Sequence, residues 1–227
     1  LRSRGPYYGL MEFCDYQIGR ILDALEQHGL AEDTIVAYVS DHGEMMGEQG
    51  LWFKRSFYEQ SSRVPMVVRW SGVVAAGSRY ERATSLIDLV ATMLDVAEAD
   101  RRHTDGEILA PLLRGEEEDG EGLAILEFEG AGTVTPARSI RRGRYKVNYY
   151  HGEPTELFDL EEDPGEYTDL VDDPGHAGVV AELTSIALTD WDPDRITERV
   201  LESQQQRRIV AKAMGGPWSP TWRNGQY

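Results

Sequence analysis

The sequence predicts an α/β protein, in which helices flank a sheet and a small antiparallel sheet follows, because three patterns occur in that order. Apolar residues recur at helical spacing over residues 8–28. A β-branched apolar run at 34–39 comes next, and short segments in which apolar and polar residues alternate lie between 123 and 159. With 227 residues, the chain can form one substantial core or part of a larger one.

The N-terminal part is predicted to contain a helix and then a buried strand. Residues 8–28 form an amphipathic helix that ends at Gly29. The face of this helix that we expect to be buried consists of Leu10, Cys14, Ile18, Leu22 and Leu25. The strand at 34–39 is predicted to be parallel to its neighbour, because it is almost entirely apolar. A loop, a strand and a helix are then expected over residues 44–63, 65–70 and 85–97.

The C-terminal part is predicted to be an antiparallel sheet followed by helices. Its strands are expected at 123–129, 137–142, 145–150 and 157–159. Helices are expected at 179–188 and 194–214, before an irregular tail that is rich in aromatic residues. This pattern divides the chain into an α/β part, an antiparallel subdomain, and a terminal helix with its tail, over residues 1–120, 121–190 and 191–227.

Acidic residues dominate the charge of the chain. Asp and Glu total 40 against 23 Lys plus Arg, which gives a net charge of −17. Nucleic acid is therefore not expected as a partner, since its binding needs a positive face. The basic residues are almost all arginines, and the lysines are Lys54, Lys146 and Lys212. This composition suits a salt-adapted cytoplasm, where ions screen the repulsion, and equally a GC-rich genome that favours arginine.

The sequence indicates neither a membrane anchor nor a definite compartment. No apolar run reaches the roughly 20 residues that span a bilayer, and the first residues do not form a signal-peptide pattern. Cys14 is the one cysteine, so no disulfide can form within the chain. A cytoplasmic location is slightly favoured, but the chain begins at Leu1, so the native N-terminus can lie further upstream. The oligomeric state, including a homo-oligomer, is left open.

The most informative segment is the pentapeptide SDHGE at 40–44, which directly follows the first predicted strand. Ligands of open α/β sheets bind outside the carboxyl ends of the strands, and Asp41 and His42 are both residue types that ligate metals. Lys54, on the same loop, would supply a cation for an anionic tetrahedral substrate such as a sulfate or phosphate ester. The alternative is a turn in which Asp41 caps the next helix.

The longer segment SDHGEMMGEQGLWFKRSFYEQSSRVPMVV, at 40–68, closely resembles the C-terminal metal motif of the sulfatases in the alkaline phosphatase superfamily. It looks most like the branch of the choline-sulfatases and phosphonate monoester hydrolases. Further segments resemble motifs of that family in the same order, at 8–29, 85–89, 105–115, 141–146 and 156–166. The resemblance covers about residues 7–175 and implies part of an alkaline-phosphatase-like mixed or parallel sheet flanked by helices.

The resemblance also implies a role for each residue of the motif. Asp41 and His42 would be metal ligands, and Lys54 would bind a sulfate oxygen or the oxygen of the leaving group. Glu44 could orient His42 or equally lie at the surface, and Arg63 would tie the loop to the sheet. Ca²⁺ is the expected metal, but many sulfatases carry Asn where this chain has His42, and an imidazole also suits Mn²⁺ or Zn²⁺. Arg55, Tyr58 and Glu59 could line the pocket, but they are interpreted as residues that pack the loop.

The nucleophile of the family is not found in this sequence. Sulfatases use a formylglycine made from Cys or Ser in a C/S-x-P-x-R motif near the N-terminus of the domain. Cys14 is followed by DYQI, and the segment SPTWR at 219–223 has Thr where the motif needs Pro. Nothing resembles the segment that carries the two N-terminal metal carboxylates either. The sequence is therefore expected to be the C-terminal half of a sulfatase-like enzyme, with the missing N-terminal half as its partner.

Three functions follow as alternatives from these observations. The first is hydrolysis of a small sulfate ester by the whole enzyme, and the second is hydrolysis of phosphonate or phosphate esters by the same fold. The third is a non-catalytic remnant that serves as an interaction or structural module. On its own the chain is expected to be inactive. It is also expected to be poorly soluble or self-associating, because half of a sheet leaves a strand edge and an apolar face uncovered.

Overall fold

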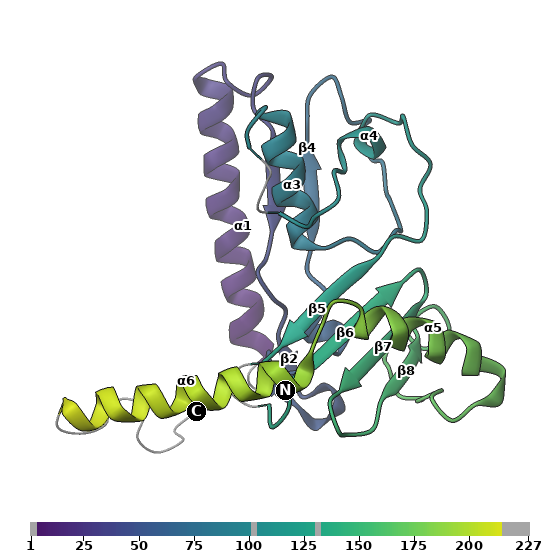
Figure 1. Cartoon of the computed structure of the whole chain (residues 1–227). Helices are drawn as coiled ribbons and strands as arrows, with labels where there is room; N and C mark the ends of the chain where they lie inside the picture. The colour runs from purple at the N-terminus through teal and green to yellow at the C-terminus, as the bar shows by residue number, and fades with distance from the viewer. Residues whose placement is uncertain (1–3, 101–103, 130–132, 215–227) are drawn as a thin grey trace.

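The computed structural model describes residues 4–100, 104–129 and 133–214, so the segment SPTWR and the aromatic tail lie outside it. Figure 1 shows two regions. One region contains the long helix α1 (Arg4–Gln27), the strands β1 (Val36–Val39) and β4 (Met66–Arg69), and the helix α3 (Leu86–Val96). The other contains a four-stranded sheet with the helices α5 (Ala177–Leu188) and α6 (Pro193–Ala213).

The strands β1 and β4 form a two-stranded sheet, and their pairing corrects one expectation. They run antiparallel, with Val36 opposite Arg69 and Val39 opposite Met66, whereas a parallel strand was predicted. The reason is that the intervening segment 40–65 leaves the carboxyl end of β1 and returns into β4 at that same end. The sheet is also less buried than its apolar sequence suggests, because Tyr38 and Val67 are exposed.

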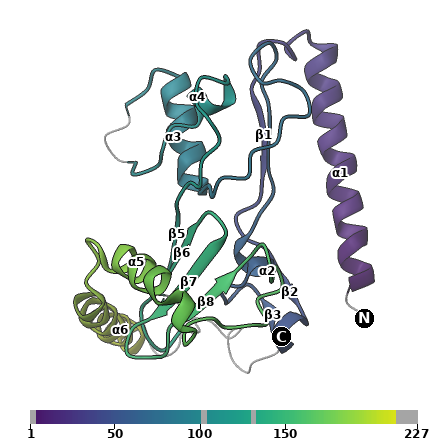
Figure 2. The same ribbon diagram turned by 90° about the vertical axis from the view of Figure 1, so that its right-hand side faces the viewer.

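The helix α1 lies beside these strands (Figure 2). Its apolar face is only partly covered, because Ile18, Leu22 and Leu25 are half-buried. The helix was predicted correctly, but no residue of it is buried, and both Leu10 and Cys14 are exposed instead of packed. Helical spacing predicts which residues share a face but not whether a partner covers that face. The N-terminal part of the apolar face of α1 is thus exposed. None of the described helices is long and apolar enough to cross a membrane.

The helix α3 begins at the place that the sequence predicts and is fixed by a capping box. The side chain of Ser85 accepts from the backbone of Asp88, and the Asp88 carboxylate accepts from the backbone N–H of Ser85 at 2.7 Å. The second oxygen of Asp88 accepts from the N–H of Glu107 at 2.8 Å, so one buried carboxylate joins the helix to the segment that precedes α4 (Ala110–Leu113).

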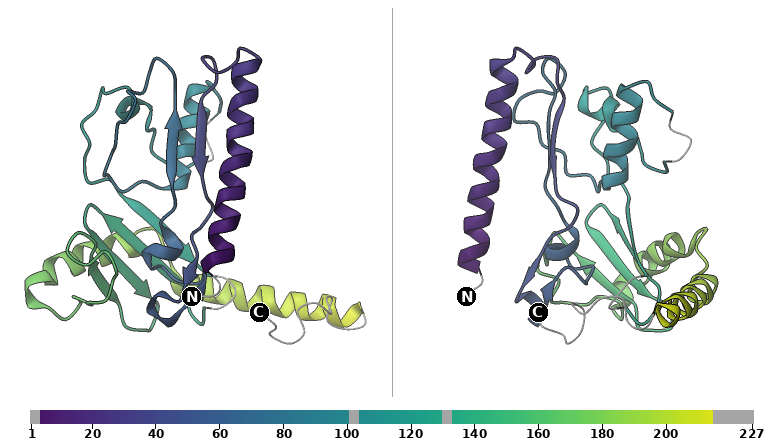
Figure 3. Two further views of the ribbon diagram at one scale, coloured as in Figure 1. Left: turned by 180° about the vertical axis from the view of Figure 1, so that it is seen from behind. Right: turned by 90° about the vertical axis from the view of Figure 1, so that its left-hand side faces the viewer.

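The C-terminal sheet has the antiparallel topology that the sequence predicts. Its strands follow one another in chain order: β5 (Ala124–Phe128), β6 (Ala137–Arg142), β7 (Tyr145–Tyr150) and β8 (Glu156–Asp159). After the short 3-10 helix η2 (Pro174–His176), the helix α5 packs on β6 and β7. The core between them consists of Ile140, Val147, Leu157, Leu183 and Ala187. The helix α6 extends away from this sheet and has no buried residue (Figure 3).

Candidate metal centre

The segment 40–44 sits at the carboxyl end of β1, as predicted, and is held there by backbone contacts. The N–H of Gly43 donates to the carbonyl of Ser61 at 2.7 Å, and the N–H of Glu44 donates to the carbonyl of Gln60 at 2.8 Å. Both carbonyls belong to the short helix α2 (Glu59–Ser62). A Cβ on Gly43 would lie 2.0 Å from the carbonyl oxygen of Gln60. Gly43 is therefore required because α2 approaches closely.

The imidazole of His42 has a defined tautomer. Its Nδ1 lies 2.8 Å from the carbonyl oxygen of Gly43. A carbonyl can only accept, so Nδ1 carries the proton and Nε2 carries the lone pair. That lone pair faces Nζ of Lys54 at 2.7 Å and lies 3.4 Å from Oδ2 of Asp41. The three side chains singled out in the sequence therefore converge on one point.

A small hairpin brings Lys54 back over His42. The strand β2 (Met45–Met46) pairs antiparallel with β3 (Trp52–Phe53), and the 3-10 helix η1 (Glu48–Gly50) joins them. Met45 is completely buried and anchors the hairpin. Phe53 has a φ of 72°, a left-handed conformation that is uncommon for an aromatic residue and turns the chain just before Lys54. The local sequence does not reveal this turn, because no glycine marks it.

The other two residues expected near the site, Glu44 and Arg63, form no hydrogen bond or ion pair with the imidazole. The ring of His42 contacts Asp41, Gly43 and Lys54 among the described residues, and Glu44 is held to α2 through its backbone. Arg63 is exposed, and its N–H donates to the carbonyl of Glu59 at 2.8 Å. A cavity of about 880 Å³ beside the site is lined by Asp41 and Arg63 among others. The orienting role of Glu44 stays a prediction.

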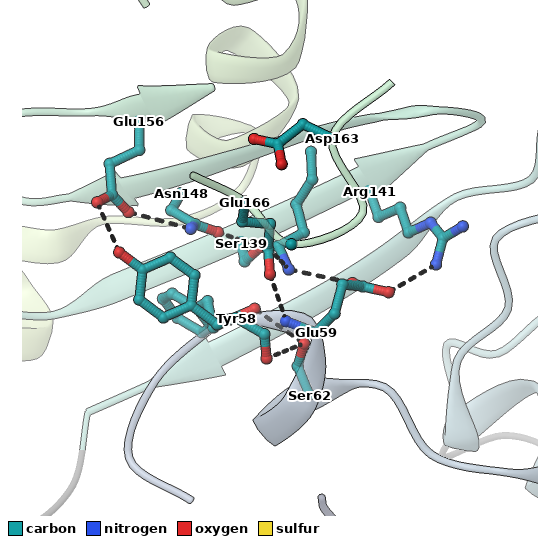
Figure 4. A network of polar contacts seen from close by, with 12 residues as sticks. Tyr58, Glu59, Ser62, Ser139, Arg141, Asn148, Glu156, Asp163 and Glu166 are labelled. Carbon is teal, nitrogen blue, oxygen red and sulfur yellow. Dashed lines mark hydrogen bonds and ion pairs between the residues drawn. The ribbon is translucent and has the colours of Figure 1, made fainter. Parts of the chain in front are cut away.

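The sequence interpretation missed a buried polar cluster behind the loop (Figure 4). Lys146 of β7 is 1% exposed, and its Nζ lies 3.1 Å from Oε1 of Glu59 and 2.6 Å from Oε1 of Glu166. Arg141 approaches the second oxygen of Glu59 at 3.3 Å. The scarcity of lysine could have indicated this cluster, because each of the few lysines is informative. The sequence interpretation assigned a role to Lys54 alone.

A second polar network lies next to that cluster. Tyr58 and Tyr150 donate to the two oxygens of Glu156 at 3.4 and 3.3 Å. Burial, and then the Glu156 carboxylate, raises the pKa of Tyr58 to about 12 and raises the pKa of Tyr150 further. Both phenols therefore keep their protons at neutral pH and act as donors. Tyr58 and Glu59 thus tie the loop to the C-terminal sheet, and Glu59 also lines the cavity beside the site.

The donor set fits a divalent metal in part. The side chain of Asp41 is 84% exposed and offers a carboxylate oxygen. His42 offers the lone pair of Nε2, and the hydrogen bond from its Nδ1–H to the carbonyl of Gly43 orients that lone pair. Among residues 4–100, 104–129 and 133–214, no three His, Cys, Asp or Glu side chains lie close enough to share an ion. The chain can therefore supply two ligands at this point, while a complete coordination shell needs further ligands from elsewhere.

Comparisons with a family model and with known proteins all identify sulfatases as similar to this chain. A sequence model described as Sulfatase matches residues 2–99. Choline-sulfatase of Rhizobium meliloti (strain 1021) is 35% identical over 235 residues, which cover 100% of this chain and 43% of that protein. Arylsulfatase K of Gallus gallus is 33% identical over 176 residues, covering 73% of this chain and 33% of that protein. The chain thus spans less than half the length of these relatives and corresponds to their C-terminal part.

Solved structures agree with the sequences. A protein solved in complex with its substrate D-glucosamine-2-N,6-O-disulfate has a TM-score of 0.72 and 28% identity, covering 79% of this chain and 40% of that one. The phosphonate monoester hydrolase of Agrobacterium radiobacter has a TM-score of 0.70 and 32% identity, covering 81% and 40%. The fold is therefore that of the sulfatases and their alkaline-phosphatase-like neighbours, as the resemblance implied. On sequence and structure together, the chain belongs to the sulfatase family.

Proposed function

We propose that this chain forms the C-terminal part of a sulfuric ester hydrolase that acts on a small sulfate ester. One observation carries the proposal. At the end of β1, Nε2 of His42 lies 3.4 Å from the Asp41 carboxylate and 2.7 Å from the Lys54 ammonium. Two metal-ligating groups of different chemistry and one cation thus meet at a single exposed point, which is an arrangement suited to an anionic ester.

Asp41 and His42 would hold a divalent metal, with Ca²⁺ as the first expectation and Mn²⁺ or Zn²⁺ favoured by the imidazole. When bound, such an ion supplies Lewis-acid stabilisation of the charge on the ester oxygens. The lone pair of His42 cannot serve both an ion and Lys54. Once that lone pair is taken, the Lys54 ammonium loses its acceptor and can bind an ester oxygen, where it stabilises the charge that develops as the S–O bond breaks.

The remaining parts of the reaction would come from another segment. The C/S-x-P-x-R motif that yields formylglycine does not occur in the 227 residues, and the described residues supply only two ligands. We therefore expect the nucleophile and the other metal carboxylates on a preceding N-terminal half, which would also cover the exposed face of α1. On this proposal the chain alone does not turn over esters.

A second candidate is hydrolysis of phosphonate or phosphate esters. It is favoured by the likeness to the phosphonate monoester hydrolase of Agrobacterium radiobacter and by His42, which suits metals other than Ca²⁺. The same three residues would serve either chemistry, because both substrates present anionic oxygens on a tetrahedral centre. The preference between sulfur and phosphorus would then be decided by residues outside this motif.

The test is complementation. The chain would be co-expressed with the N-terminal part of the choline-sulfatase of Rhizobium meliloti, carrying its matured nucleophile, and the complex assayed with an aryl sulfate and an aryl phosphonate monoester. We expect turnover by the pair, none by the chain alone, and none by the pair with Asp41→Ala. The control is Asp33→Ala, which removes the same charge before β1 and should stay active.

The outcomes separate the alternatives. A higher rate on the sulfate ester supports the sulfatase, and a higher rate on the phosphonate supports the second candidate. A soluble complex that turns over neither ester would mean that the chain is a non-catalytic remnant. Turnover of the sulfate ester by the chain alone, lost in Asp41→Ala, would contradict the need for a second half.

A further inference from the structure

The buried cluster behind the loop joins α2 to the C-terminal sheet through opposite charges. The Lys146 ammonium lies between two carboxylates, 3.1 Å from that of Glu59 on α2 and 2.6 Å from that of Glu166 in the turn after β8. The side chains of Lys146 and Glu166 are 2% and 0% exposed, so water does not screen this contact. A buried carboxylate without its cation is strongly unfavourable, which makes Lys146 the residue on which the cluster depends.

Glu166 also binds the backbone of the loop. Its second oxygen accepts from the N–H of Glu59, the first residue of α2, at 2.6 Å. Gln49 of η1 donates to the carbonyls of Gly165 and Glu166 at 2.9 and 3.0 Å. Glu166 itself has a φ of 56°, a conformation that needs support from its surroundings. One turn of the C-terminal part therefore holds two separate points of the site loop.

The same short helix holds the candidate metal motif from its other side. The carbonyls of Gln60 and Ser61 accept from the N–H groups of Glu44 and Gly43. The carbonyl of Gly43 in turn accepts from Nδ1 of His42 and fixes the imidazole. An ion pair and hydrogen bonds therefore connect the ammonium of Lys146, through α2, to the ring of His42.

We propose that Lys146 is a positioning residue for the Asp41–His42 site, which it orients through Glu59 and the backbone of α2. Its role as a positioner of a metal site depends on the function proposed above, but its hold on the segment 41–44 does not. Lys146 touches neither the imidazole nor the Asp41 carboxylate. Its contribution would be to fix the direction of the His42 lone pair by keeping α2 against β7.

The first experiment measures hydrogen exchange at single amides in the protein and its Lys146→Met variant. We expect the amides of Gly43 and Glu44 to exchange faster by about tenfold or more, which corresponds to the loss of one hydrogen bond to a charged group. The amides of Ile140 and Val147, in the core of the C-terminal sheet, should change much less. Equal acceleration at all four amides, or none at Gly43 and Glu44, would overturn the proposal.

A matched control and a milder variant keep the test decisive. Ser139 is fully buried in the same sheet, and its hydroxyl donates to Oδ1 of Asn148 at 2.7 Å without reaching α2. Ser139→Ala should loosen the sheet without a selective effect at Gly43 and Glu44; a selective effect would count against Lys146. If Lys146→Met does not fold, Glu166→Gln keeps the ammonium and weakens both its ion pair with residue 166 and the bond to the Glu59 N–H. It should still accelerate those two amides, and unchanged exchange there would refute the proposal.

A second readout separates this proposal from the proposed function. The complemented complex would be titrated with Mn²⁺ by calorimetry, and binding should be weaker when its chain carries Lys146→Met than when the chain is unaltered. Binding of equal strength would mean that the hold on residues 41–44 does not matter for the metal, and would overturn the positioning role. If neither complex binds Mn²⁺ while the amides of Gly43 and Glu44 respond as expected, the metal assignment fails and the structural coupling stands.

Discussion

Nζ of Lys54 lies 2.7 Å from Nε2 of His42, so a lysine occupies the direction in which the imidazole lone pair points. The backbone carbonyl of Gly43 determines this direction, because it requires the proton on Nδ1. Lys54 and a metal ion are therefore alternatives at one lone pair.

The identity of residue 42 should influence which metal is preferred. His42→Asn replaces an imidazole nitrogen by an amide oxygen, which is the better donor for Ca²⁺ and the poorer one for Mn²⁺ or Zn²⁺. We expect the ratio of Mn²⁺ to Ca²⁺ affinity to fall on the order of tenfold or more. Competition titrations in the complemented complex would measure this ratio. His28→Asn, in the exposed turn after α1, should leave this affinity ratio unchanged. An equal change in the ratio for His28→Asn would contradict a metal site at His42.

Removing the Lys54 ammonium should reduce turnover more than metal binding. Lys54→Met is expected to lower kcat of the complemented complex by about 10²–10³-fold, the effect of losing one group that stabilises developing charge. Metal affinity should not fall, because Nε2 of His42 no longer has an ammonium as a competitor. Lys212→Met, on the exposed surface of α6, is the matched control and should keep full activity. Unchanged kcat in Lys54→Met would remove Lys54 from the reaction.

Gly43 should not tolerate a side chain. Gly43→Ala places a Cβ 2.0 Å from the carbonyl oxygen of Gln60, so α2 must move. We expect the free energy of unfolding to fall by about 1–3 kcal/mol, as for other overpacked sites. Gly9→Ala, on the open surface of α1 with no atom within 4 Å of the new Cβ, should instead raise it by about 0.5–1 kcal/mol. Denaturant midpoints measure both changes, and equal stability of the two variants would contradict this close approach.

The hairpin that carries Lys54 should weaken in acid. The backbone N–H groups of Met46 and of Glu48 itself lower the pKa of the Glu48 carboxyl below 4.5, and Arg4 lowers it further against the opposing effect of burial. A carboxyl with a lowered folded pKa stabilises the fold above its unfolded pKa and loses that contribution as pH falls through the folded value. The contribution of Glu48 is therefore complete above about pH 4.5 and disappears below it.

Glu48→Gln should remove this acid dependence. The free energy of unfolding, measured between about pH 3 and 7, should depend less steeply on pH in the variant than in the unaltered protein. Glu117→Gln, in the exposed acidic loop at 116–121, serves as the comparison and should retain the original slope. Identical slopes in all three proteins would show that Glu48 does not stabilise the hairpin through its charge.

Local patterns predicted the elements well and their surroundings poorly. The periodicity of residues 8–28 and the alternation at 137–150 lie within single elements, so the helix α1 and the strands β6 and β7 could be recognised from the chain alone. The direction of β4 relative to β1 depends on the path of the loop between them. The exposure of Cys14 depends on what packs against α1. Local sequence patterns therefore predict neither the strand direction nor the exposure.

The candidate site divides in the same way. Asp41 and His42 could be predicted because they directly follow a strand, and Lys54 because a family motif includes it. The left-handed turn at Phe53 could not be predicted, since aromatic residues rarely adopt it. The contact of Lys146 with Glu59 joins residues 87 positions apart, beyond the reach of any spacing rule. Charges that meet across such distances are found only when the chain is folded.

The same separation in sequence has a consequence for how the protein acquires its shape. The hairpins β5 to β8 connect neighbours in the chain and can form early, because little entropy is lost when short loops close. The N–H of Glu59 reaches its acceptor only across 107 residues. The segment 41–44 leaves the ribosome well before Glu166 does, because the chain is synthesised from its N-terminus. We therefore expect the segment to emerge first and to become ordered last, when the turn that holds α2 has been made.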